Sequence, residues 1–185
     1  RVNSPISETL GIDRQREAQI LKLLAPSGII PKIFYITDEV LVSEYIEGEQ
    51  LTRQSLKNTA TMEAVSVALR AIQAVAMPDG IPRNYLQYCR NYLDQLADDC
   101  ISPAVKQEIE TIARAVDNSD WQPVICPHDM VPQNIIENAR GVTIIDWEYA
   151  ALGHPDLDFM RLFGADFSVS GRQENILQPL FKVQQ

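Results

Sequence analysis

The sequence predicts an α+β protein of two lobes, and three observations lead to that prediction. The 185 residues are 45% hydrophobic and 22% charged, which allows one core with a smaller lobe beside it. The predicted elements run helix, hairpin, helices, short strands, helix. Gly48 separates the first two elements from the others. We therefore expect an incomplete N-terminal lobe at residues 1–48 and a mainly helical, truncated C-terminal lobe at residues 49–185.

The smaller lobe is predicted to hold one helix and one hairpin. Apolar residues recur at helical spacing over Gly11–Leu24, and Pro26 ends that pattern. Two runs rich in β-branched and aromatic residues follow, at Lys32–Thr37 and Val40–Ile46. The polar pair between these runs indicates a tight turn, so we expect a β-hairpin.

The larger lobe is predicted to consist of helices followed by short strands. Ser102 stands where an N-cap is expected, and a proline follows at the first helical position. The predicted helices are Thr61–Ala76, Tyr85–Cys100, Pro103–Val116 and Pro155–Phe163. The predicted strands are Val124–Cys126, Ile135–Glu137 and Val142–Asp146, the last two joined by a turn over Asn138–Gly141.

Composition narrows the range of partners and locations. The net charge of -9 argues against nucleic acid or an anionic membrane as a partner. The three cysteines match no zinc pattern, and no secretion signal is evident, which favours a reducing cytoplasm. No apolar run approaches the roughly 20 residues of a membrane span. Nothing in the sequence indicates the oligomeric state.

Three oxygen-bearing side chains point to phosphoryl transfer. That reaction needs oxygen ligands that converge on a divalent ion, and a carboxylate beside the acceptor hydroxyl. Asp129 and Asn134 are separated by four residues, a span that can arch as a loop and aim both side chains at one cavity. Asp146 ends a strongly apolar run, so its carboxylate should emerge at a rigid strand end. We expect the three side chains to meet.

The same stretch resembles a known superfamily. The order of motifs is similar to the catalytic loop and metal-binding strand of protein-kinase-like enzymes: Asp-x-x-x-x-Asn, then a hairpin, then an apolar strand that ends in Asp. Asp146-Trp-Glu-Tyr149 and Gly153-His-Pro-Asp-Leu-Asp158 resemble the aminoglycoside phosphotransferase and choline/ethanolamine/thiamine kinase superfamily, and look closer to its choline and thiamine kinase branch. The resemblance implies a protein-kinase-like fold, ATP and Mg²⁺ as cofactors, Asp129 as catalytic base, Asn134 and Asp146 as metal ligands, and Asp158 as support for the catalytic loop.

Earlier residues match the nucleotide-binding part of the same superfamily. The helix around Glu17 resembles the one whose glutamate pairs with a basic residue on the preceding strand, and Arg1 stands in that basic position. Val42-Ser-Glu-Tyr-Ile-Glu-Gly48 resembles the strand and hinge whose backbone reads adenine. The resemblance therefore implies nucleotide binding by Arg1, Glu17, Ser43 and Tyr45.

Two features depart from the superfamily pattern. Pro127 stands where a histidine is usual, and His128 directly precedes Asp129. We expect His128 to support the loop by hydrogen bonds, since Asp129 already takes the role of base. The glycine-rich hairpin that covers the phosphates is missing, so it either lies upstream of this fragment or was lost.

The residues after Asp146 have two interpretations. Trp147 and Tyr149 offer aromatic faces to a cationic substrate, but packing into the core is slightly favoured. If the strand continues beyond Asp146, alternation places Glu148 on the same side as Asp146, behind the metal ligands. The Tyr85, Tyr88 and Tyr92 series at helical spacing is interpreted as one packed face.

The leading functional prediction is ATP-dependent phosphorylation of a small cationic alcohol such as choline, ethanolamine or thiamine. An aminoglycoside phosphotransferase would share the fold and remains an alternative. A second alternative is a nucleotide-binding pseudokinase that has lost activity, which Pro127 and the missing hairpin favour. The intact set of Asp129, Asn134 and Asp146 argues against it.

Overall fold

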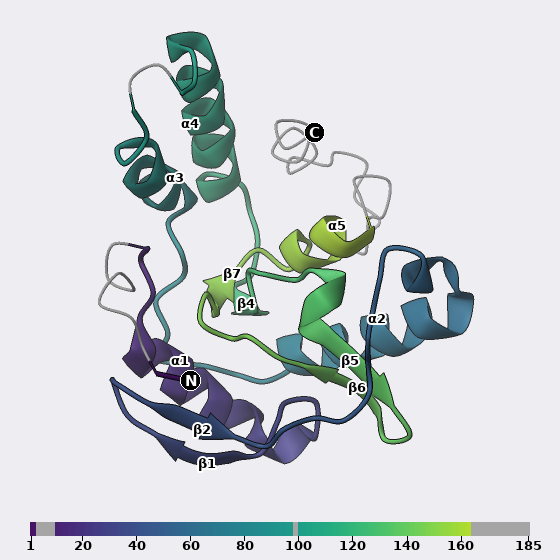
Figure 1. Ribbon diagram of the computed structural model, residues 1–185. Helices are drawn as coiled ribbons and strands as arrows, with labels where there is room; N and C mark the ends of the chain where they lie inside the picture. Colours follow the sequence, from purple (N-terminus) through teal and green to yellow (C-terminus); the bar gives the residue numbers. More distant parts are fainter. Residues whose placement is uncertain (3–9, 98–99, 164–185) are drawn as a thin grey trace.

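The computed structural model describes residues 1–2, 10–97 and 100–163 (Figure 1). Its helices are α1 (Arg14–Leu24), α2 (Thr59–Gln73), α3 (Tyr85–Leu93), α4 (Pro103–Asp117) and α5 (Leu157–Phe163), with short 3₁₀ turns η2 (Ala25–Ser27), η3 (Ser55–Lys57) and η4 (Pro132–Asn134). Its strands are β1 (Ile33–Ile36), β2 (Leu41–Ser43), β3 (Glu49–Gln50), β4 (Val124–Cys126), β5 (Ile135–Asn138), β6 (Gly141–Ile144) and β7 (Ala151–Gly153).

Side-chain caps fix where four of the helices begin. Asp13, Asn58, Asn84 and Ser102 each accept a hydrogen bond from a backbone N–H in the first turn of α1, α2, α3 and α4, respectively. Such a bond satisfies an N–H group that has no partner within the helix. The N-cap predicted at Ser102 is confirmed.

The described strands form three small antiparallel sheets. The predicted hairpin is present as β1 and β2, and the predicted turn over Asn138–Gly141 joins β5 to β6. β3 begins directly after Gly48 and pairs with β5, so a short segment near residue 50 is fixed to a strand more than eighty residues away. β4 pairs with β7. The division of the chain at residue 48 remains a prediction.

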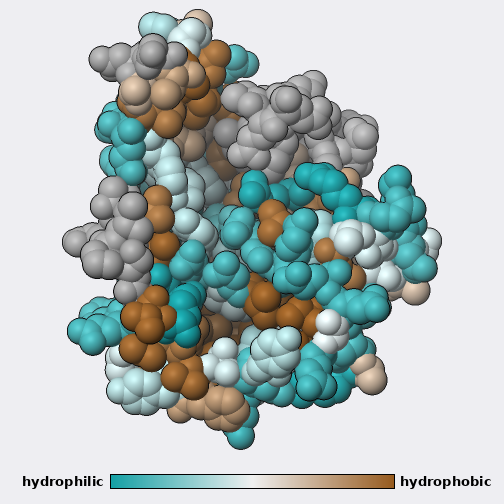
Figure 2. All heavy atoms as spheres, viewed as in Figure 1, coloured by the Kyte–Doolittle hydropathy of each residue, from teal (hydrophilic) through white to brown (hydrophobic). Residues whose placement is uncertain are grey.

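One main hydrophobic core connects most of these elements. Its fully buried side chains include Ile20 and Leu24 of α1, Leu69 and Ile72 of α2, Ile125 of β4, Ile135 of β5, Ile144 of β6 and Phe159 of α5. A smaller cluster of Tyr85, Ala113, Val116 and Met160 joins α3 and α4 to α5. Hydrophobic side chains also show on the lower part of the face in Figure 2, among hydrophilic ones. No helix in the described part of the chain is both long and apolar enough to cross a membrane.

Several predicted boundaries were wrong. The helix predicted from Gly11 starts at Arg14, because Asp13 caps it. The helix predicted over Tyr85–Cys100 ends at Leu93, and residues 98–99 of that span lie outside the described residues.

The strand predicted over Val142–Asp146 also ends early, at Ile144. The reason lies in its partner β5, which begins at Ile135. The residues before Ile135 form the 3₁₀ turn η4, so β6 has no strand to pair with after Ile144. The alternation expected for Trp147 and Tyr149 therefore does not apply.

Candidate active site

The loop between β4 and β5 brings Asp129 and Asn134 into direct contact. The Asn134 side-chain amide donates to the Asp129 backbone oxygen at 2.9 Å and to Asp129 Oδ2 at 3.2 Å. The 3₁₀ turn η4 folds the chain back on itself within these few residues. Because the nitrogen of the Asn134 amide is used in this way, its oxygen is turned away from Asp129 and can accept a further ligand.

The β5–β6 hairpin places Asp146 beside Asn134. Ile135 pairs with Ile144, and just beyond this pair the Ile145 N–H donates to the Asn134 carbonyl at 2.9 Å. Asp146 is the next residue, with a φ of 60°, and 42% of its side chain is exposed. The left-handed backbone turns the chain away from the strand direction at this point. Asp129 therefore contacts Asn134, and Asp146 follows the residue that is hydrogen-bonded to Asn134, at one end of the hairpin; the meeting of all three side chains stays a prediction.

Negative charge accumulates around Asp146. Partial burial raises the pKa of its carboxyl group, and the nearby carboxylate of Glu148 raises it further, while Arg1 opposes the shift. Asp129 and Glu17 also raise this pKa. A cation bound here would relieve this repulsion.

The residues present fit a hard divalent ion such as Mg²⁺. An amide oxygen and a carboxylate are the ligand types that this ion prefers, and it commonly takes few protein ligands and completes its shell with phosphates and water. Among residues 1–2, 10–97 and 100–163, no group of three or more His, Cys, Asp or Glu is placed to hold a metal. If an ion binds here, Asn134 and Asp146 would supply part of its shell, and the phosphates of a nucleotide would complete it.

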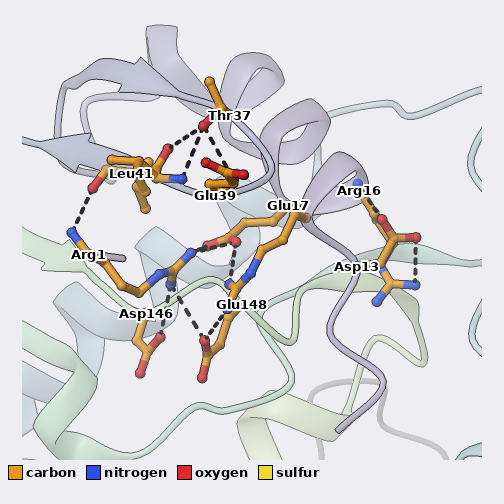
Figure 3. A network of polar contacts seen from close by, with 11 residues as sticks. Arg1, Asp13, Arg16, Glu17, Thr37, Glu39, Leu41, Asp146 and Glu148 are labelled. Atoms are coloured by element: carbon orange, nitrogen blue, oxygen red, sulfur yellow. Dashed lines mark hydrogen bonds and ion pairs between the residues drawn. The ribbon is translucent and has the colours of Figure 1, made fainter. Parts of the chain in front are cut away.

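A network of arginines and glutamates lies next to this site (Figure 3). Arg1 Nη2 lies 2.7 Å from both carboxylate oxygens of Glu17, and Arg14 Nη1 lies 2.8 Å from one of them. Glu17 is only 1% exposed, so this ion pair is largely shielded from water. Arg1 Nη1 also lies 3.8 Å from Asp146 and 3.7 Å from Glu148. Arg1 thus connects helix α1 to the candidate metal site.

A cavity of about 560 Å³ opens beside the network. Its lining includes all four residues predicted to bind nucleotide, Arg1, Glu17, Ser43 and Tyr45, together with Asp146 and Trp147. The volume lies within the range of small-molecule pockets. The cavity therefore extends from the segment after β2 to the candidate metal site.

His128 occupies a fixed place in the loop. Its Nδ1 lies 3.1 Å from the Cys126 carbonyl, which can only accept, so Nδ1 carries the proton. Burial lowers the pKa of His128 well below its usual range, and the Arg83 guanidinium lowers it further, so the ring is neutral. Its Nε2 then accepts from the Tyr85 hydroxyl at 3.2 Å. These contacts suit a residue that supports the loop.

Helix α5 also holds the loop. The His128 backbone N–H donates to Asp158 Oδ1 at 3.1 Å, which is the contact expected of a residue supporting the loop from the next helix. Close packing continues on the other side, where a Cβ on Gly153 would lie 2.6 Å from the His128 ring. Only glycine fits at this position of β7 without displacing the ring.

The aromatic residues near the site are mostly occupied by contacts within the chain. Trp147 is 3% exposed and belongs to the main core, and its indole N–H donates to the Ile144 carbonyl at 2.8 Å. The Arg83 guanidinium lies over the ring of Tyr88 at 4.1 Å and donates to the Tyr149 carbonyl. Glu148 lies behind the site, 3.2 Å from Arg14.

Sequence reasoning missed three arginines that shape this site. Arg14 pairs with Glu17, Arg83 holds the backbone at Tyr149, and Arg161 Nη2 lies 3.3 Å from Asp129 Oδ1. Two of them carried a signal in the sequence. Arg14 precedes Glu17 by three residues, a spacing that brings side chains together on a helix. Arg161 follows Asp158 by the same spacing.

Comparison with known proteins places the chain in a family. A family model described as choline/ethanolamine kinase matches residues 1–184. The chain belongs to the choline/ethanolamine kinase family. Family membership accounts for the Asp-Trp-Glu-Tyr stretch beginning at Asp146, which resembled this branch of the superfamily.

Individual relatives support the family and the fold. Ethanolamine kinase 1 from Mus musculus is 28% identical over 177 residues, which are 86% of this chain and 49% of that protein. Choline kinase LicA from Streptococcus pneumoniae superposes with a TM-score of 0.74 at 24% identity, covering 96% of this chain and 64% of LicA. The structure of LicA in complex with AMP superposes with a TM-score of 0.70 at 25% identity. The ternary streptomycin–ATP–APH(2'')-IIa complex gives a TM-score of 0.58 at 18% identity, over 85% of this chain and 60% of that one.

These comparisons confirm the predicted α+β, protein-kinase-like fold with a mainly helical C-terminal lobe. The chain spans about half the length of the ethanolamine kinase and under two thirds of LicA.

Proposed function

We propose that this choline/ethanolamine kinase family chain transfers the γ-phosphoryl group of ATP to the hydroxyl of a small cationic alcohol, such as choline, ethanolamine or thiamine. One observation carries the proposal: Asp146 lines a nucleotide-sized cavity, and the Ile145–Asn134 and Asn134–Asp129 hydrogen bonds link it to the loop that carries Asp129. Both the family and the LicA–AMP complex favour a nucleotide in that cavity.

The roles follow from position. Asp129 would orient the acceptor hydroxyl and take its proton as the bond to phosphorus forms. Asn134 Oδ1 and the Asp146 carboxylate would hold Mg²⁺, which supplies charge neutralisation on the phosphates when bound. Ser43 and Tyr45 line the end of the cavity where the adenine would lie. Catalysis would rest on positioning and electrostatics, without a covalent intermediate.

The Glu17 network would position the phosphates. Glu17 pairs with Nη2 of the Arg1 guanidinium, which leaves Arg1 Nη1 near Asp146 and Glu148. An arginine in this place offers forked donors suited to phosphate oxygens. Arg14 in turn bridges Glu17 and Glu148, so the carboxylates near Asp146 are partly neutralised by the chain itself.

The test is turnover by the full-length gene product. ADP release should be detected with at least one alcohol from a panel of choline, ethanolamine and thiamine, and Asp129→Ala should abolish it while the fold is retained. Asp79→Ala, which removes an exposed carboxylate, is the matched control and should keep full turnover. Turnover that survives Asp129→Ala would refute the assigned role.

Two alternatives have their own outcomes in this test. The similarity to an aminoglycoside phosphotransferase structure motivates one of them, and aminoglycoside resistance in cells that carry the gene would favour it. Pro127 motivates the pseudokinase alternative. Thermal stabilisation by ATP and Mg²⁺ without any transfer or hydrolysis would favour that one.

A further inference from the structure

One face of helix α5 contacts two consecutive residues of the catalytic loop, His128 and Asp129. Asp158 and Arg161 are three residues apart, so their side chains lie on the same face of the helix. Asp158 Oδ1 accepts the backbone N–H of His128 at 3.1 Å, and Arg161 Nη2 lies 3.3 Å from Asp129 Oδ1. The first contact fixes the backbone of the loop, and the second reaches its reactive side chain.

The Asp129 carboxylate is thereby held at both oxygens. Asn134 donates to Oδ2 at 3.2 Å from one side, and Arg161 donates to Oδ1 at 3.3 Å from the other. The terminal torsion of an aspartate is soft, so a carboxylate held at one oxygen can still rotate. Two donors on separate structural elements remove that freedom. Each oxygen keeps a lone pair for an acceptor hydroxyl.

The helix that carries Arg161 is firmly anchored. Phe159 and Met160, which directly precede it, are 0% and 1% exposed, and they belong to the two different hydrophobic clusters. The Arg161 side chain itself is 31% exposed and that of Asp129 is 28% exposed, so the pair is only partly screened by water. A rigid helix that presents a guanidinium at a half-buried carboxylate is suited to fixing its direction.

We propose that Arg161 is a positioning residue that orients the Asp129 carboxylate toward the acceptor hydroxyl. The inference rests on the proposed function, since it assigns Asp129 the role of base. Arg161 would act on the reaction through Asp129, the side chain that it contacts. Loss of the guanidinium should therefore slow turnover without weakening substrate binding.

Steady-state kinetics of the full-length protein test this role. Arg161→Ala should lower kcat by roughly 10- to 100-fold, the range expected when a reacting group is displaced by about 1 Å or less. KM for ATP and for the alcohol should stay within about twofold of wild type, because the proposed role gives Arg161 no contact with either substrate. Arg161→Lys should recover only part of kcat, since a flexible point charge does not reproduce the planar fork. Arg70→Ala, which removes an exposed arginine of α2, is the matched control and should behave as wild type.

Chemical rescue separates positioning from a general effect on the fold. Added guanidinium ion, at concentrations that do not denature the control, should raise kcat of Arg161→Ala and leave Arg70→Ala unchanged. An unchanged kcat in Arg161→Ala would overturn the proposal, and so would a loss that falls on KM for ATP. A loss of kcat that guanidinium does not relieve would overturn it as well. If Arg161→Ala does not fold, Arg161→Gln takes its place under the same criteria.

A second measurement does not depend on turnover. In urea unfolding, the midpoint shifts of Arg161→Ala and Asp129→Ala should be non-additive in the double variant, because each removes the same contact. Additive shifts would overturn the contact itself. If wild-type protein is inactive but the midpoint shifts are non-additive, the proposed function is refuted while the Arg161–Asp129 interaction is established. The two failures are therefore distinguishable.

Discussion

Replacing Asp158 with asparagine should change how the stability of the protein depends on pH. Asp158 is 0% exposed, and its Oδ1 accepts the His128 N–H. Burial raises the pKa of this carboxyl group to about 7, from 3.8 in an unfolded chain. Asparagine keeps the shape and the accepting oxygen but does not titrate.

The sign and size of the effect follow from the two pKa values. Below about pH 4 the Asp158 carboxyl is protonated in both states. As pH rises from there to about 7, the unfolded chain loses this proton and the folded chain keeps it, so the free energy of unfolding falls. Each unit of pKa difference corresponds to about 1.4 kcal/mol, which amounts to about 4 kcal/mol over the whole interval. Above about pH 7 the loss is complete and the dependence ends.

Urea unfolding of wild type and Asp158→Asn from pH 5 to pH 8 measures this. The stability of wild type relative to the variant should fall by about 3 kcal/mol over that range, with most of the change below pH 7. Asn84→Ala, which removes the cap of α3 and no titrating group, is the control and should cost about 1 kcal/mol at every pH. A difference between wild type and Asp158→Asn that stays flat across the range would refute the reasoning.

Three further outcomes are expected. Glu17→Gln should lower the free energy of unfolding by about 3 kcal/mol or more in urea titration. The substituted side chain is buried and carries no charge, so the Arg1 guanidinium loses its ion-pair partner. Gly153→Ala should lower the thermal midpoint and reduce turnover together, since its methyl group overlaps the His128 ring, with a cost of about 1–3 kcal/mol. Asn58→Ala should cost about 1 kcal/mol, because two N–H groups of α2 lose their acceptor, and turnover at saturating substrate should not change.

Local patterns in the sequence were sufficient to find much of the fold and of the site. Helices and strands followed from spacing, and caps such as Ser102 marked helix starts. The Asp129–Asn134 contact was predictable because four intervening residues can arch as a loop that brings both side chains together. The strand before Asp146 was recognisable from its apolar run, and pairing with β5 then carries Asp146 to Asn134.

Contacts between distant elements were beyond the reach of such patterns. The pairing of Arg161 with Asp129 depends on how α5 packs against the loop, and side-chain burial decides that packing. The end of β6 at Ile144 depends on its partner strand β5, because the turn η4 directly before β5 offers no strand to pair with. The core packing that the sequence slightly favoured for Trp147 is observed, but the early end of β6 that precedes it was not predicted.

The three-stranded β3–β5–β6 sheet has a consequence for which nucleotides the cavity would accept. Gly48 and Gln50, which line the cavity, lie just before β3 and at its end, and the Leu51 N–H donates to the carbonyl of Ile135, the residue after Asn134. Backbone hydrogen bonds therefore connect the cavity wall at Gln50 to the β5–β6 hairpin that leads to Asp146. A nucleotide bound as proposed would have to fit between these backbone-linked elements, so the length of its phosphate chain would decide whether it reaches Asp146.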